Sequence, residues 1–125
     1  MMNVSQTTFE DIVRKAIDGI PDKYYEHIKN LAFVVEDQPS PMQRKKLKLA
    51  ENQSLYGLYE GVPLTKRGAG YNLVLPDKIT IFMLPIQASA NSYEELVDQV
   101  KETVWHEVAH FYGLDHGQIH SLQDK

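Results

Sequence analysis

The sequence contains no cysteine, and this absence removes several kinds of chemistry at once. Disulfide bonds, thiolate zinc sites and cysteine nucleophiles are all excluded. No apolar run approaches the roughly 18 residues that a membrane-spanning helix needs. The first residues also lack a basic segment followed by an apolar stretch, so we expect no secretion signal. We therefore expect a cytoplasmic protein that does not enter a membrane.

The chain also lacks an excess of positive charge, which bears on its partners. The formal net charge is −4, and this argues against nucleic acid as the main partner. The one basic run, Arg44-Lys45-Lys46 with Lys48, falls in an expected helix. A solvated helix face is favoured there over a phosphate-binding patch.

The length and composition predict one domain covering residues 1–125. The chain has 42% hydrophobic and 24% charged residues, which is typical of a globular protein with a small core. There is no repeat, low-complexity tract or convincing linker. We expect residues 1–7 to be a flexible N-terminus and the protein to be a monomer.

Apolar residues at helical spacing predict several helices in the first half of the chain. The first is expected to begin at Thr8 as the N-cap and to close at Gly19 and Pro21. A second, short helix is expected from Asp22 to about Asn30. Ser40-Pro41 predicts a third helix start, because proline is favoured at the first helical position.

Three short segments rich in β-branched and aromatic residues predict strands. AFVVE (Ala32–Glu36) reads as a buried strand, and Leu55–Tyr59 is a second candidate. KITIFML (Lys78–Leu84) is the strongest prediction. The glycine-rich segment GVPLTKRGAGYN (Gly61–Asn72) is expected to be a loop.

The last long helix is the most informative element. Ser92 and Glu95 form the pattern S-x-x-E of a capping box, which predicts a helix start near Tyr93. At about 100° per residue, one narrow apolar stripe follows and must face the core, formed by Val97, Val100, Val104, Val108 and Phe111.

Two histidines project from nearly the opposite side of this helix. His106 and His110 are one turn apart and therefore close together, with Glu107 on a flank between the two faces. They belong to the pattern H-E-x-x-H-x-x-G-x-x-H, present as HEVAHFYGLDH. A random arrangement of the same residues would contain it about once in 30,000 chains, so chance is a poor explanation.

The spacing of this pattern has a physical reason in metal binding. Histidines at i and i+4 supply one edge of the nitrogen tetrahedron that zinc prefers. Gly113 is suited to the left-handed conformation that ends a helix, so that His116 can approach the metal from the other side. The fourth position stays open for water, as in catalytic zinc sites. We expect one Zn²⁺ per chain, bound by His106, His110 and His116.

Glu107 is expected to act as a general base toward the zinc-bound water, whose pKa the metal lowers to about 7. The expected reaction is attack of this water on a peptide carbonyl, with the proton passed to the leaving amine. A non-catalytic zinc-stabilised interaction module and a hydrolase of non-peptide amides are the alternatives. A purely structural site has no need of a base at position 107.

Beyond the histidine pattern, the chain resembles the small bacterial zincin-like metallopeptidases, also described as minimal metalloproteases. The similarity runs from about Phe9 to Leu122 and includes GLYEGVPLT (Gly57–Thr65) and LPDKITIF (Leu75–Phe82). The resemblance implies a compact α+β fold, with a small mixed sheet packed on the zinc helix and further helices toward the N-terminus. It also implies the three histidine ligands and the catalytic Glu107.

The sequence departs from two related groups. Metzincins carry the same histidine pattern but have a methionine turn after the third histidine, and no methionine follows His116 here. A gluzincin needs a glutamate ligand about 20 residues beyond the second histidine, and no glutamate follows His110. The third ligand stays open between His116, Asp115 and His120.

Other parts of the proposed site are less defined by the sequence. Tyr59, Tyr71 and Tyr112 could each offer a phenol to an oxyanion, but packing is the expected role of all three. Substrate is expected to lie extended along a sheet edge, supplied either by the Leu55–Tyr59 or by the Lys78–Leu84 strand. Little material remains for deep pockets, so we expect weak or narrow activity on unfolded segments or short peptides.

The assignment of His116 leads to the first test. Replacing His116 with alanine removes one of three nitrogen ligands, so the variant should lose tight, stoichiometric zinc. Metal content after dialysis against a weak chelator measures this. A variant that retains one tightly bound zinc would move the third ligand to another residue.

Overall fold

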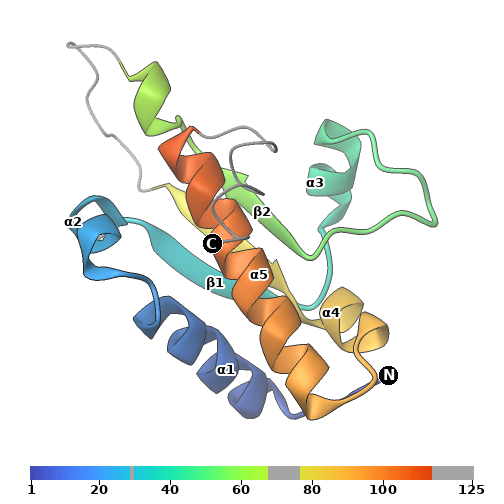
Figure 1. Cartoon of the computed structure of the whole chain (residues 1–125). Coiled ribbons are helices and arrows are strands. Elements are labelled where there is room, and N and C mark those ends of the chain that lie inside the picture. The colour runs from blue at the N-terminus through green and yellow to red at the C-terminus, as the bar shows by residue number, and fades with distance from the viewer. Residues whose placement is uncertain (29, 68–76, 114–125) are drawn as a thin grey trace.

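The computed structural model describes residues 1–28, 30–67 and 77–113, which alternate short helices and strands (Figure 1). The fold is of the α+β class, with a small mixed sheet and helices packed on it, as expected. Along these residues the elements are α1 (Gln6–Asp18), a 3₁₀ turn (Asp22–Tyr24), α2 (Tyr25–Ile28), β1 (Ala32–Glu36), α3 (Pro41–Lys46), β2 (Gly57–Glu60), a second 3₁₀ turn (Leu64–Lys66), β3 (Lys78–Phe82), α4 (Met83–Ser89) and α5 (Tyr93–Tyr112).

The sheet has the strand order β1-β3-β2, with β3 in the centre. β1 pairs with β3 in parallel, and β2 pairs with β3 antiparallel, so that Thr80 lies opposite both Val34 and Leu58. Since β3 is paired on both sides, it cannot offer an edge to a substrate. The expected Lys78–Leu84 edge is therefore wrong, and β2 remains as the candidate edge near α5.

The hydrophobic core lies between the sheet, α1 and α5. In Figure 1 α5 crosses in front of the sheet and α1 lies beside α5, so that the apolar stripes of the two helices meet. Helix α1 buries Phe9, Ile12, Val13 and Ala16 at helical spacing, as expected. Strand β3 contributes Ile79 and Ile81, and α5 contributes a stripe formed by Leu96, Val100, Val104, Val108 and Phe111.

Several boundaries differ from the predictions for identifiable reasons. Helix α1 begins one turn earlier than expected, because the Ser5 hydroxyl, and not that of Thr8, caps it by accepting the Thr8 backbone N–H at 3.1 Å. The first residues also differ from a flexible end. The Met2 and Val4 backbone N–H groups donate to the backbone and side-chain oxygens of Gln87.

The strand predictions were correct in place but not in every bound. β1 is a strand, yet its side chains are mostly half-buried because it is an edge of the sheet. β3 ends at Phe82, two residues before the predicted end at Leu84, and Met83 begins α4. The apolar run continues from the strand into the helix, so it did not mark this boundary. Pro85 is compatible with that helix because it occupies the first turn, where its missing N–H costs nothing.

Helix α5 begins and ends as its sequence predicts. The Ser92 hydroxyl accepts the Glu95 backbone N–H, while the Glu95 carboxylate accepts the N–H of Asn91. The helix ends at Gly113, whose φ of 87° is the left-handed conformation expected there. A Cβ at this position would also lie 2.0 Å from the Thr65 hydroxyl oxygen.

The contacts of α5 with α1 and the sheet fix the position of this helix. No helix within residues 1–28, 30–67 and 77–113 combines the length and apolar character needed to cross a membrane.

Two glycines that end helices offer a matched test of this geometry. Gly113→Ala should destabilise the fold by at least about 1–2 kcal/mol, because alanine is strained at positive φ and its methyl group meets Thr65. Gly19 has a φ of −81°, and a Cβ there would meet only the Ala16 and Lys15 carbonyl oxygens at 3.5 and 3.6 Å, which is ordinary contact, so Gly19→Ala should be neutral or slightly stabilising. Urea denaturation of both variants measures the difference. Equal stability changes would contradict this account of Gly113.

Candidate metal centre

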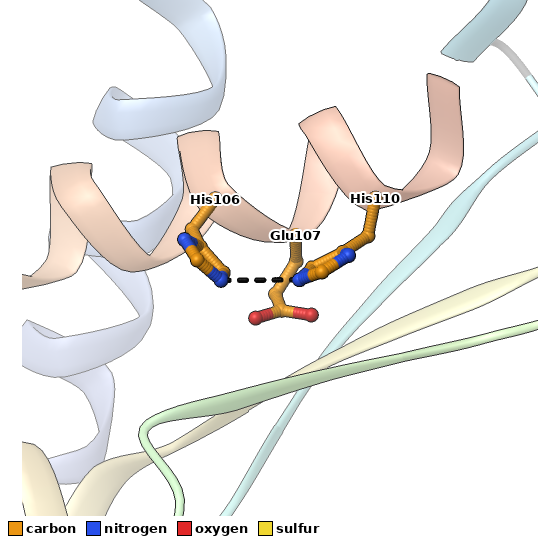
Figure 2. A group of neighbouring side chains, drawn as sticks. All are labelled: His106, Glu107 and His110. Carbon is orange, nitrogen blue, oxygen red and sulfur yellow. Dashed lines mark hydrogen bonds between the residues drawn. The ribbon is translucent and has the colours of Figure 1, made fainter. Parts of the chain in front are cut away.

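Helix α5 brings the first two histidines of the pattern together. Their Nε2 atoms are 3.1 Å apart, and their ring centroids are 4.7 Å apart at an angle of 73°. Figure 2 shows both rings projecting from the same side of the helix, with the Glu107 side chain beside them. The sequence placed His106 and His110 on one face, and the structure confirms that spacing.

The distance between the rings suits a tetrahedral metal. Two nitrogen ligands about 2.05 Å from a tetrahedral zinc ion are about 3.3 Å apart. The observed 3.1 Å is close to this value. Ligand atoms of His106, Glu107 and His110 all lie within 4.8 Å of one another, so the three residues form a group that could hold a metal ion. Two neutral imidazoles and one carboxylate are donors that zinc accepts.

Glu107 is more deeply buried than its expected place on the helix flank suggested. Its exposed fraction is 7%, and it lies among the buried residues of α5. Burial raises the pKa of the Glu107 carboxyl to about 7, against the opposing effect of a hydrogen bond from the Tyr59 backbone N–H. A cation held by the neighbouring histidines would favour the charged carboxylate again. Glu107 therefore has its raised pKa in metal-free protein, and beside a bound cation it would be the charged carboxylate that a general base requires.

The edge of β2 that does not pair with β3 lies beside the Glu107 carboxylate. The Tyr56 carbonyl accepts the Phe82 N–H at 2.8 Å, so residues 56, 58 and 60 face β3 in the antiparallel pairing. Gly57 and Tyr59 direct their N–H and C=O groups to the opposite side. This alternation explains how the Tyr59 N–H meets Glu107.

Gly57 allows β2 to pass close to α5. A Cβ at this position would lie 2.7 Å from Thr103 Cγ2 and 3.1 Å from Glu107 Cγ. A glycine inside a strand often marks such a close approach of backbone, and this signal was available in the sequence. Any larger residue would push the edge strand away from the carboxylate.

A groove of about 330 Å³ opens beside the metal-binding group. One wall is the chain entering β2, formed by Leu55, Tyr56 and Gly57. The other wall is one side of α5, and it is formed by Gln99, Glu102, Thr103, His106 and Glu107. Sequence reasoning missed Gln99 and Glu102, because only the tertiary packing of β2 makes a wall opposite them.

A buried ion pair anchors β2 at its far end. The Asp77 carboxylate, 4% exposed, accepts a hydrogen bond from the Tyr59 hydroxyl at 2.6 Å and pairs with Arg67. The Arg67 guanidinium also lies over the ring of Phe111 at 5.5 Å, which ties the anchor to α5. The sequence signal was an aspartate directly before an apolar strand, and its partners could not be read from the sequence.

The tyrosines proposed for an oxyanion mostly have other partners. The Tyr59 hydroxyl donates to Asp77, and the Tyr112 hydroxyl donates to the Tyr24 carbonyl at 2.7 Å. Both bonds agree with the expected packing roles. Tyr71 lies outside the described residues.

The third ligand cannot be located in the described part of the chain. His116 and its competitors Asp115 and His120 all lie outside the described residues. The reversal at Gly113, which was expected to direct the chain back toward the metal, is present. His116 therefore stays a prediction.

Comparisons with known proteins agree with this geometry. A family model described as zincin-like metallopeptidase matches residues 28–125. Among solved structures, a conserved hypothetical protein from Thermus thermophilus is similar, with a TM-score of 0.58 over 96% of this chain and 98% of that chain. The two share 19% sequence identity, so this likeness concerns the fold alone. A search of curated proteins finds no match.

The raised pKa of Glu107 predicts how metal-free protein responds to pH. The folded pKa of about 7 lies above the ordinary 4.5, so the folded state keeps a proton that the unfolded state has lost. This contribution to stability is present at low pH and is lost as pH rises from about 4.5 to about 7. Glu107→Gln cannot ionise and should gain up to about 3 kcal/mol over the native chain at pH 8, at 1.36 kcal/mol per pKa unit.

Urea denaturation in the presence of a chelator measures this difference at pH 5 and pH 8. The glutamine oxygen can accept the same N–H bond from Tyr59, so the comparison isolates the charge. A stability difference that does not grow with pH would show that Glu107 is not penalised by burial.

Proposed function

This chain belongs to the zincin-like metallopeptidase family, and on that premise we propose that it is a zinc-dependent peptidase. The observation that carries the proposal is the pair of Nε2 atoms 3.1 Å apart beside the buried Glu107 carboxylate. His106, His110 and His116 bind the zinc ion, and Glu107 is the general base. The protein acts as a cytoplasmic monomer.

The chain's own residues perform the proton transfers. Bound zinc supplies a Lewis acid that polarises the peptide carbonyl and makes water acidic enough to react near pH 7. Glu107 takes a proton from the attacking water as its oxygen bonds to the carbonyl carbon. The same carboxyl then gives the proton to the amine nitrogen as the C–N bond breaks.

The substrate lies extended along the outer edge of β2. Gly57 offers its N–H and C=O there, and Tyr59 offers its C=O, because its N–H is bonded to Glu107. Added strands of this kind gain backbone hydrogen bonds irrespective of sequence. Folded proteins rarely present such segments, which supports activity on short peptides or unfolded stretches. A screen that found vigorous cleavage of folded proteins would contradict this narrow activity.

Glu107→Gln provides the decisive test of catalysis. The variant should retain zinc and lose cleavage by about 10²–10⁴-fold, the usual contribution of a general base. Bound metal, cleavage of a peptide pool and thermal stability are measured on both proteins, purified in parallel so that contaminating protease is revealed. Cleavage in neither protein, with a large stability loss on chelation, would instead show a structural zinc module.

A further inference from the structure

The groove between β2 and α5 has the size of a pocket for one side chain. Its volume of about 330 Å³ is at the lower end of the range for ligand sites. It opens beside His106 and Glu107, so a peptide bond placed for attack would direct a neighbouring side chain into it. The groove can therefore select which peptide bonds are cleaved.

The α5 wall of the groove follows a single stripe of the helix. Gln99, Glu102, Thr103 and His106 are spaced i, i+3, i+4 and i+7, which places them on one face. Glu102 is one helical turn before His106, about 6 Å along the axis. The carboxylate is therefore within one side-chain length of the proposed reaction centre.

The ionisable side chains that line the groove are two glutamates, Glu102 and Glu107, and one histidine, His106. Neither lysine nor arginine is among the residues that line it. Glu107 is buried and bonded to Tyr59, whereas Glu102 is exposed and has no ion-pair partner in the described ranges. The opposite wall is formed by Leu55, Tyr56 and Gly57, and the apolar Leu55 can contact an alkyl stem.

The polar side chains between these groups also suit a cationic head. The Thr103 hydroxyl donates to the Gln99 carbonyl at 2.7 Å and accepts from the Gln99 side-chain amide at 3.4 Å, which leaves one lone pair of its oxygen for a further hydrogen bond. An acidic substrate side chain would face like charge. An apolar one would remove water from Glu102 without compensation.

We propose that this groove is the specificity pocket and that it selects a lysine or arginine side chain next to the cleaved bond, with Glu102 as the specificity-determining residue. The alkyl stem lies along Leu55, and the charged head pairs with the Glu102 carboxylate. This inference rests on the proposed peptidase function, because it takes the bond beside His106 and Glu107 as the one that is cleaved.

The test measures binding in protein that does not cleave. Zinc-loaded Glu107→Gln is titrated with capped, fluorescent pentapeptides that differ only in a central lysine, methionine or glutamate. The lysine peptide should bind about threefold to tenfold more tightly than the methionine peptide, and the glutamate peptide should bind least. The preference should decrease with added salt, because it is electrostatic.

A second substitution assigns the preference to one carboxylate. Adding Glu102→Gln should bring the lysine and methionine peptides to equal affinity. Asp98→Asn is the matched control, because Asp98 is exposed on the same helix and does not line the groove. It removes the same charge and should leave the preference intact. Equal loss in both variants would indicate a general field, and it would overturn the role of Glu102.

The two proposals fail in different ways. The Glu107→Gln protein could bind lysine peptides preferentially while the native chain cleaves none. That result would overturn the peptidase function and retain the pocket for a cationic side chain. Cleavage by the native chain without preference for lysine or arginine beside the bond would remove the pocket and retain the peptidase. Absence of binding by the lysine peptide at millimolar concentration also overturns the pocket.

Discussion

The close contact of β2 with α5 at Gly57 is the constraint on which the rest of the site depends. The missing side chain lets the strand backbone approach Thr103 and Glu107 to distances at which a Cβ would collide. At that separation the Tyr59 N–H meets the Glu107 carboxylate, and the outer edge of the strand lies beside the histidines. One small residue thus sets both the environment of the base and the position of the substrate edge.

The helical repeat of α5 places core residues on one face and the two histidines on another. Its valine stripe packs on α1 and β3, while residues on the neighbouring face carry the imidazoles. Glu107 lies between these faces and is drawn into the interior, where a carboxylate is costly to ionise. A cation bound by His106 and His110 would offset this cost, so metal binding and stability should be linked. We therefore expect the metal-free protein to be less stable than the metal-bound protein at a pH where Glu107 is ionised.

The Asp77–Arg67 pair gives the edge strand its second attachment. Tyr59 bonds to Asp77 through its hydroxyl and to Glu107 through its backbone, so the two ends of this residue connect the anchor with the base. Arg67 over Phe111 closes the connection back to α5. A rigid edge of this kind holds a substrate backbone in place without a deep cleft, which fits the small size of the chain.

Much of this protein is determined by local sequence. The cap at Ser92, the reversal at Gly113 and the stripe of α5 follow from hydrogen bonding and helical spacing between near neighbours, and so does the pairing of His106 with His110. Other features required contacts between residues distant in the chain. The sequence could not assign β3 to the centre of the sheet, bury Glu107, or place Glu102 opposite Leu55. Strand order, burial and groove shape depend on which surfaces meet, and only the tertiary structure decides that.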